Sequence, residues 1–343
     1  MGLIANSFGG GKISWMKMLV DHKFAEIISL DNLLAAWQEF VVGKRGRLDV
    51  QVFAGRLMDN IYDLHYDLVE RKYQHGAYQD FKISDPKPRH IHKARVRDRL
   101  LHHAIYRQLY PYFDSLFVSD SFSCRLGKGT HKALARFETF SRQISKNNSR
   151  TAWTLKGDIK KFFASIDHKI LIAILRLRVG DGDLLELLKN IIGSFHDEVT
   201  GQGLPLGNLT SQLFANIYLN EFDRFVKHGL KARYYIRYAD DFVILADQRA
   251  ELIELVPLLQ KFLLERLKLV LHPDKLFIKT VASGVDFLGW VHFPKHRVMR
   301  RATKLRMMRK LATNQKEATR NSYLGLIKHG NTYKLRASLF GEY

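Results

Sequence analysis

Cysteine is nearly absent from this chain of 343 residues, which contains only Cys124. A single cysteine excludes an intramolecular disulfide and a metal cluster held by several thiolates. Long apolar runs are also missing, because no window of about 18 residues is free of charge, so we expect no membrane-spanning helix. Residues 1–11 lack the basic start and small-residue cleavage pattern of a signal peptide. We therefore expect a cytoplasmic protein with no membrane partner.

Acidic residues are outnumbered, because 34 Asp and Glu face 55 Lys and Arg, giving a formal net charge of +21. The content of hydrophobic residues, 46%, and of aromatic residues, 12%, is typical of an ordered globular protein with two or three subdomains. Basic residues cluster at 43–47, 87–107 and 297–310, with aromatic residues beside the second cluster. This pattern favours a nucleic-acid partner over an anionic lipid surface or a charge that only maintains solubility.

The segment from Tyr234 to Leu245 predicts a β-hairpin with two adjacent carboxylates at its tip. Runs rich in β-forming residues flank Asp240 and Asp241 on both sides. Because aspartate is a common turn residue, a solvated turn is one interpretation. Two carboxylates fixed side by side on a packed sheet repel each other unless cations lie between them. The second interpretation of this turn is therefore a metal site.

A third carboxylate, Asp158, is expected at the end of a strand over residues 151–159, on the face that carries Thr154 and Lys156. Asp167 is interpreted as a helix cap. The apolar spacing predicts helices over 29–73 (in two parts joined by the linker 43–47), 96–109, 213–222, 252–271 and 297–311. Two further strands are expected over 275–279 and 285–290.

Two glycine-rich loops are candidates for contact with phosphates. In the first loop, residues 121–130, Arg125 and Lys128 lie close to glycines in the sequence. In the second, residues 201–212, glycines and a proline precede a predicted helix. An ordinary exposed turn and a plain connecting loop are the respective alternatives. The run Gly9-Gly-Gly-Lys12 lacks the strand and the Ser or Thr of a phosphate loop, so we interpret it as a flexible lead-in.

The 15 histidines are scattered along the chain. His102, His103 and His168 lack the spacing of metal ligands, and we expect them at the surface or facing phosphates.

Asp158 and the Asp240–Asp241 pair can be brought together by one antiparallel sheet. Such a cluster can hold two Mg²⁺ ions about 4 Å apart, one to activate an attacking hydroxyl and one to bind a triphosphate. Three carboxylates that bind two metal ions, together with a basic surface that holds a template, are the groups that a nucleotidyl transferase requires.

The order of the motifs resembles that of bacterial reverse transcriptases of the group II intron-like lineage, over about residues 81–292. The motifs in chain order are Pro86-Lys-Pro-Arg89, Arg97-Asp-Arg-Leu100, Ser121-Phe-Ser-Cys-Arg125, Asp158-Ile-Lys-Lys-Phe-Phe163, Gly203-Leu-Pro-Leu-Gly207 with Ser211, Tyr238-Ala-Asp-Asp241 and Phe287-Leu-Gly289. The resemblance implies an α+β right-hand polymerase. Its N-terminal helices and fingers would span 1–155, its palm 156–290 with a finger insertion at about 170–205, and its helical thumb 291–343.

By this resemblance, Asp158, Asp240 and Asp241 are the catalytic residues. Together with Ile159 they are implied to bind two Mg²⁺ ions, for which Mn²⁺ can substitute. The residues implied to bind the dNTP are Lys87, Arg89, Phe163, Leu206 and Gly207. Among these, Phe163 resembles the steric gate that excludes a ribose 2′-hydroxyl.

The resemblance also implies residues that bind nucleic acid, including a primer grip at 287–289 and a basic thumb helix. They are Arg97, Arg125, Lys128, Gln212, Tyr238, Leu288, Gly289, Arg300, Arg301 and Lys304.

Two departures from the group II pattern are similar to the enzymes of diversity-generating retroelements. Leu206 stands where the group II pattern has Gln, and Gln212 stands where it has Pro. In that family the missing Gln is associated with misincorporation opposite template adenine. The resemblance thus implies error-prone RNA-directed DNA synthesis. Its partners would be a template RNA, the RNA–cDNA duplex, dNTPs and an accessory protein subunit. The alternatives are a phage-defence reverse transcriptase that copies a non-coding RNA, and an inactive RNA-binding scaffold.

Overall fold

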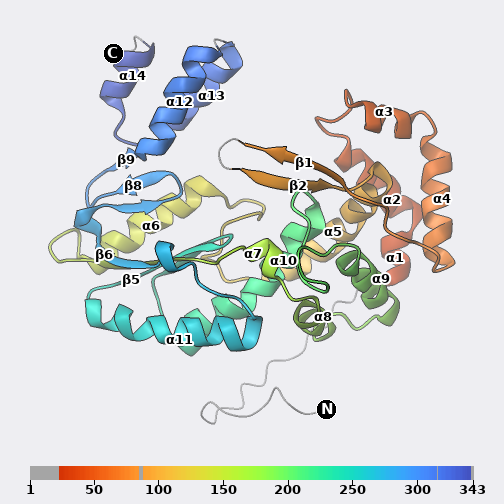
Figure 1. The fold of residues 1–343 in the computed structure, drawn as a ribbon, viewed down its shortest axis with the longest axis horizontal. Helices are drawn as coiled ribbons and strands as arrows, with labels where there is room; N and C mark the ends of the chain where they lie inside the picture. Colours follow the sequence, from red (N-terminus) through yellow and green to blue (C-terminus); the bar gives the residue numbers. More distant parts are fainter. Residues whose placement is uncertain (1–22, 85–87, 315, 341–343) are drawn as a thin grey trace.

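The computed structural model describes residues 23–84, 88–314 and 316–340. The N-terminal helices lie at one end of an elongated molecule, and the larger sheets and the C-terminal helices lie toward the other end (Figure 1). The fold is α+β with antiparallel sheets, as the sequence predicts. In the described part of the chain, no helix is both long and apolar enough to cross a membrane.

A four-stranded antiparallel sheet forms the centre of the fold. Its strand order is β4 (Tyr235–Tyr238), β5 (Asp241–Ala246), β3 (Trp153–Asp158) and β6 (Phe277–Thr280). The predicted hairpin is therefore confirmed as β4 and β5, and the predicted strand over 151–159 is confirmed as β3. The strand predicted over 275–279 begins later, because residues 273–275 form a short 3₁₀ turn.

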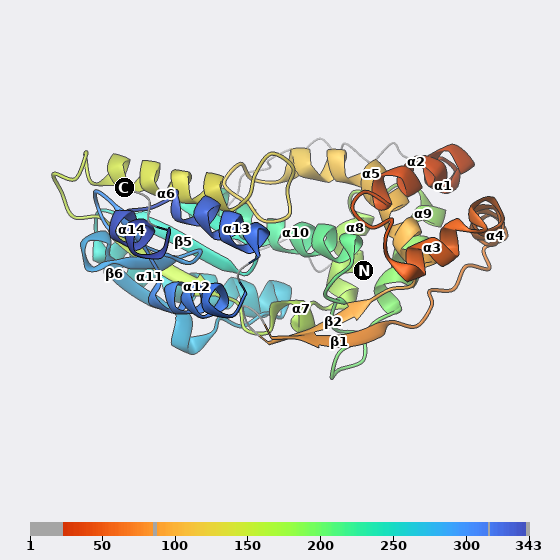
Figure 2. The same cartoon turned by 90° about the horizontal axis from the view of Figure 1, so that it is seen from above.

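Both faces of this sheet are covered, so alternate residues of its strands enter two separate cores. Leu155, Phe242 and Ile244 pack with the side of the sheet that meets α10 (Leu209–Arg224) and α11 (Arg249–Leu267). Residues of the opposite face pack against α6 (Thr130–Ile144); they are Ile236, Val243 and Leu245. In Figure 1 and Figure 2, α6 and α11 lie on opposite sides of strand β5.

The helix predicted over 252–271 ends at Leu267, because Lys268 adopts a left-handed conformation with φ 53°. The following residues then run beside the end of β3: Leu271 bridges to Ile159, and the His272 N–H donates to the Asp158 carbonyl at 2.8 Å.

The N-terminal helices pack against the long helix α5 (Val96–Leu116), which continues past its predicted end at residue 109. Asn32 connects the two layers, because its side-chain amide donates to the carbonyls of Ile27 and Ala104. The helices of this layer are α1 (Phe24–Ile28), α2 (Leu30–Phe40), α3 (Leu48–Ala54) and α4 (Leu57–Val69).

A two-stranded hairpin, in a segment for which no strand was expected from the sequence, follows the N-terminal helices. Its strands are β1 (Gln79–Ile83) and β2 (Arg89–Lys93), and it extends from the N-terminal layer toward the central sheet (Figure 1). Three helices connect β3 to α10: α7 (Phe162–Ser165), α8 (His168–Arg176) and α9 (Gly182–Gly193). The predicted cap is confirmed, because the Asp167 carboxylate accepts from the Ile170 N–H at 3.0 Å.

Two of the predicted surface histidines are buried, so that prediction is wrong for them. His168 is 7% exposed, and its Nε2 is 2.7 Å from the Gly203 carbonyl. His102 is 1% exposed on the inner face of α5. Histidine carries an apolar ring, so its burial depends on tertiary packing, which the scattered spacing does not encode.

The C-terminal part begins with a three-stranded sheet made of β7 (Val285–Phe287), β8 (Trp290–His292) and β9 (Arg297–Met299). The prediction of one strand over 285–290 is wrong, because Leu288 and Gly289 have φ values of 51° and 85° and form a hairpin turn. The predicted helix over 297–311 begins only at Arg301, since its first residues form β9. The remaining helices are α12 (Arg301–Thr313), α13 (Glu317–Ile327) and α14 (Tyr333–Phe340).

Candidate active site

The register of β3 and β5 brings the three predicted catalytic aspartates together. Asp158, the last residue of β3, lies directly opposite Asp241, the first residue of β5, and Asp240 is the turn residue before it. The Ile159 N–H donates to the Asp240 carbonyl at 3.2 Å, which ties the end of β3 to the turn. One antiparallel sheet therefore brings the carboxylates together, as the sequence predicts.

Two lysines partly compensate the negative charge of this cluster. The Lys275 ammonium donates to Asp158 Oδ1 at 2.6 Å, and the Lys156 ammonium lies 3.5 Å from Asp241 Oδ1. Burial raises the pKa of Asp240 to about 6, and the neighbouring carboxylates of Asp158 and Asp241 add to this shift. Burial also raises the pKa of Asp241, an effect that Lys156 opposes.

The donor atoms of the cluster suit a hard divalent cation. Carboxylate oxygens are ligands that Mg²⁺ and Mn²⁺ prefer, and Ile159, whose carbonyl is predicted as a further ligand, directly follows Asp158 in the chain. Among the described residues, the oxygens of the three aspartates do not all lie within 4.8 Å of one another. Asp158 pairs with Lys275 and Asp241 with Lys156. A bound cation would therefore replace the two ammonium groups in compensating the negative charge of these carboxylates.

The turn that carries Asp240 is held by Arg237, a residue for which the sequence predicted no role. Its guanidinium, 1% exposed, donates to both carboxylate oxygens of Asp223 at 2.7 Å and to the carbonyl of Ala239 at 3.1 Å. Ala239 has a φ of 53°, which is strained for a residue with a Cβ. The available signal was an arginine inside an apolar strand, since such a charge must be paired when it is buried.

The predicted nucleotide-binding loop lies against strand β2. The Leu206 carbonyl accepts from the His92 N–H at 2.9 Å, and the Asn208 amide donates to the His92 carbonyl at 2.9 Å. Gly207 has a φ of 113° and lies so close to β2 that an added Cβ would come within 2.9 Å of Ile91 Cγ2. The contact brings Leu206 and Gly207 beside the hairpin that carries Arg89.

The other predicted dNTP-binding residues have different surroundings. Phe163 is half-buried on α7, and its carbonyl accepts from the Leu204 N–H at 2.8 Å, which brings α7 beside the same loop. Arg89 is exposed at the start of β2. Lys87 lies outside the described residues.

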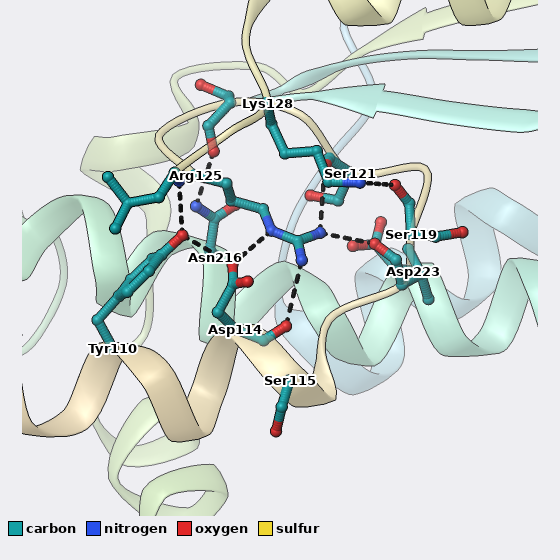
Figure 3. Close-up of polar contacts among 12 residues, drawn as sticks. Tyr110, Asp114, Ser115, Ser119, Ser121, Arg125, Lys128, Asn216 and Asp223 are labelled. Carbon is teal, nitrogen blue, oxygen red and sulfur yellow. Dashed lines mark hydrogen bonds and ion pairs between the residues drawn. The ribbon is translucent and has the colours of Figure 1, made fainter.

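The Arg125 side chain makes its hydrogen bonds inside the protein, whereas the sequence predicts that it contacts nucleic acid. Its side chain is 5% exposed and donates to the Asp114 carboxylate at 2.6 Å and to the carbonyls of Asp114, Val118 and Ser121 (Figure 3). Because these contacts occupy all three guanidinium nitrogens, Arg125 fixes the loop after α5. Lys128 in the same loop is half-buried, and its ammonium donates to the Ser119 carbonyl at 2.8 Å.

The remaining predicted nucleic-acid contacts are spread over several elements. Arg97 pairs with Asp67 at 2.5 Å, and the Tyr238 hydroxyl accepts from Thr130 at 3.0 Å. Gln212 lines a cavity of about 290 Å³ together with Gly207. Leu288 and Gly289 form the turn of the β7–β8 hairpin. Three more of the predicted contact residues follow strand β9. They are Arg300, which pairs with Asp286 at 2.5 Å, and the exposed Arg301 and Lys304.

Residues 82–292 match the family described as "Reverse transcriptase (RNA-dependent DNA polymerase)". Protein YkfC of Escherichia coli is 28% identical over 276 residues, which cover 69% of this chain and 70% of YkfC. The group II intron-encoded protein LtrA of Lactococcus lactis subsp. cremoris is 29% identical over 150 residues, which cover 42% of this chain and 24% of LtrA.

Among solved structures, the fold is similar to telomerase from Candida albicans in complex with a fragment of telomeric RNA. The TM-score is 0.50 at 12% identity, and the match covers 68% of this chain and 48% of the telomerase chain. The chain thus spans less than half the length of LtrA and of this telomerase. Because the family match takes in the strand that ends in Asp158, the Asp240–Asp241 turn and the β7–β8 hairpin, the chain belongs to the reverse transcriptase family.

Proposed function

We propose that this chain is an RNA-directed DNA polymerase that copies an RNA template into cDNA by two-metal nucleotidyl transfer. The observation that carries the proposal is the register that sets Asp158 opposite Asp241, beside Asp240, in a member of the reverse transcriptase family. Template RNA, the RNA–cDNA duplex and dNTPs are the proposed partners. The net charge of +21 supports a polyanionic partner.

We propose that the chain has the three parts of a right-hand polymerase. The N-terminal helices and the β1–β2 hairpin serve as fingers, the central sheet as the palm, and the C-terminal helices α12 to α14 as the thumb, because a boundary between residues 290 and 291 would divide β8. The palm begins before Trp153, because a boundary between residues 155 and 156 would divide β3.

In the proposed reaction, a primer 3′-hydroxyl attacks the α-phosphate of a dNTP in line and pyrophosphate leaves. Bound Mg²⁺ or Mn²⁺ would activate the hydroxyl and neutralise charge on the phosphates. The side chains of Asp158, Asp240 and Asp241, with the Ile159 carbonyl, would hold these ions. Phe163 and the Leu206–Gly207 loop would bind the sugar and base, and the exposed Arg89 would contact the triphosphate.

Primer extension on an RNA template tests this function. We expect the purified chain with Mg²⁺ and dNTPs to extend the primer, and Asp240→Ala to lower the rate by roughly 10³-fold or more. Asp247→Ala is the matched control, because Asp247 is an exposed acid just after the end of β5. Extension that survives in Asp240→Ala would reject the assignment of the site.

We further propose that synthesis is error-prone, as in diversity-generating retroelements. Leu206 supports this proposal, because an amide at that position would give the incoming nucleotide a hydrogen bond that a leucine cannot make. Sequencing of cDNA made in vitro should show misincorporation opposite template adenine, and Leu206→Gln should reduce it. Equal error rates at all four template bases in the unaltered protein would reject this part and leave the polymerase assignment intact.

A further inference from the structure

One face of the β1–β2 hairpin gathers three side chains that are typical metal ligands. Asp80 on β1 lies directly opposite His92 on β2, and His90 is two residues before His92. Residues two apart on a strand point to the same face, so all three side chains share it. Their donor atoms all lie within 4.8 Å of one another.

We propose that this face of the hairpin is a binding site for a transition metal ion of the Zn²⁺ class, separate from the aspartate cluster. Two imidazoles and one carboxylate form a nitrogen-rich ligand set that suits Zn²⁺ or Co²⁺, whereas Mg²⁺ prefers oxygen ligands. Three protein ligands leave a fourth tetrahedral position for water or another small ligand. This site does not depend on the proposed polymerase function.

The central ligand of the cluster, His92, is held in place on several sides. Its side chain is 17% exposed, and its ring lies 4.6 Å from the ring of Phe195 and 4.3 Å from that of His90. Its backbone N–H and carbonyl are both bonded to the Leu206–Asn208 loop. A ligand whose position is fixed by its surroundings loses little conformational freedom when it binds an ion.

Asp80 is the ligand that would have to adjust. Its Oδ1 lies 2.7 Å from His92 Nδ1, whereas two ligand atoms on a tetrahedral Zn²⁺ lie about 3.4 Å apart at bond lengths of about 2.1 Å. The Asp80 side chain is 52% exposed, so it is free to rotate by this small amount. The competing interpretation is a plain hydrogen bond between Asp80 and His92 without a metal.

One neighbouring charge opposes the binding of a cation. Lys82 lies opposite His90 in the hairpin and therefore shares the face of the three ligands. It is exposed, and its long flexible side chain can carry the ammonium into solvent. Removal of this charge should strengthen metal binding, which supplies a variant that acts in the opposite direction.

Titration of the full chain with Co²⁺ tests the site. The protein carries no histidine tag, Mg²⁺ is present in excess, and the visible absorption of histidine-bound Co²⁺ is followed. We expect one Co²⁺ per chain, displaced by Zn²⁺ but not by Mg²⁺. In His90→Ala and His92→Ala, binding should weaken by tenfold or more, and in Lys82→Gln it should tighten.

His228→Ala is the matched control, because His228 is an exposed histidine on a different element. Circular dichroism of each variant checks that the chain has folded. Failure of Co²⁺ to saturate, its displacement by Mg²⁺, or unchanged binding in His90→Ala and His92→Ala would overturn the proposal. Primer extension in Mg²⁺ alone reports separately on the polymerase site.

Discussion

Asp240 lies in surroundings that oppose its charge. It is half-buried beside Asp158 and Asp241, and the partial burial and the two neighbouring carboxylates raise its pKa from 3.8 to about 6. The folded protein thus binds a proton at Asp240 more tightly than the unfolded chain does. The stability that this proton provides is fully present below pH 3.8 and is lost as the pH rises through 6. At pH 8 the ionised carboxylate would cost about 3 kcal/mol of folding free energy, and a bound cation would offset this cost.

We therefore predict that Asp240→Asn stabilises the metal-free protein while it abolishes activity. In EDTA at pH 8, the free energy of unfolding should rise by about 1–3 kcal/mol, and the gain should disappear near pH 4, where Asp240 is protonated. Urea denaturation at the two pH values measures the difference. Asp247→Asn should change little at either pH, and an equal effect of Asp240→Asn at both pH values would contradict the explanation.

Arg237 is the positioning residue beneath the same turn. We predict that Arg237→Met destabilises the protein by about 3–5 kcal/mol, because Asp223 then stays buried without its ion-pair partner and keeps the Tyr235 hydroxyl as a donor. The double variant Arg237→Met/Asp223→Leu should recover much of this loss, since no buried charge then remains unpaired.

The double variant also tests the positioning role of Arg237. Because Met cannot hold the Ala239 carbonyl, the double variant should still show a low kcat with an ordinary KM for dNTP. Chemical denaturation and steady-state primer extension measure the two effects. Full recovery of kcat would show that Arg237 serves stability alone.

Among the secondary-structure elements, the β1–β2 hairpin and the loop before α10 act as one unit. Hydrogen bonds from His92 to Leu206 and from Asn208 to His92 connect segments more than 100 residues apart. Gly207 permits this contact, since its positive φ and the nearby Ile91 leave no room for a side chain. If this loop binds the incoming nucleotide as proposed, the hairpin determines its position.

We predict that Gly207→Ala costs about 1–3 kcal/mol of stability and raises the KM for dNTP. Thermal denaturation and steady-state primer extension measure the two effects. Ile91→Ala introduced into the Gly207→Ala protein should restore part of both, because it removes the methyl group that the new Cβ meets. Gly182→Ala is the control: an added Cβ there meets no atom within 4 Å, so stability should not fall and the KM for dNTP should stay unchanged.

For the whole molecule, the net charge of +21 predicts that RNA binding depends strongly on salt. If 6–10 phosphates are contacted, affinity should fall by roughly 10³–10⁵-fold between 50 and 200 mM salt. The double variant Arg301→Gln/Lys304→Gln on α12 should make the plot of log affinity against log salt less steep by about 1–2.

Fluorescence anisotropy with labelled RNA measures the salt dependence. Lys189→Gln is the control for lost charge, because Lys189 lies on α9 and pairs with Glu186. A plot with the same slope in the α12 double variant would remove this helix from the RNA-binding surface.

The sequence alone determined the local elements that carry the site. Runs of β-forming residues on both sides of an acidic turn encode β4, β5 and Asp240–Asp241, and the strand pattern before Asp158 encodes β3, because strand propensity and turn chemistry act over a few residues. The order of motifs identified the family for the same reason, since each motif is a short contiguous segment.

Only the tertiary structure decided which of these groups meet and in what surroundings. The register of β3 against β5, the pairing of Asp158 with Lys275, and the burial of Arg125 all join residues that are distant in the chain or depend on packing. The cluster of Asp80, His90 and His92 likewise exists only because two strands pair in one register. Strand pairing and charge burial are set by the free energy of the whole fold, so a local pattern such as the arginine inside strand β4 indicates that a partner is needed but does not specify which one.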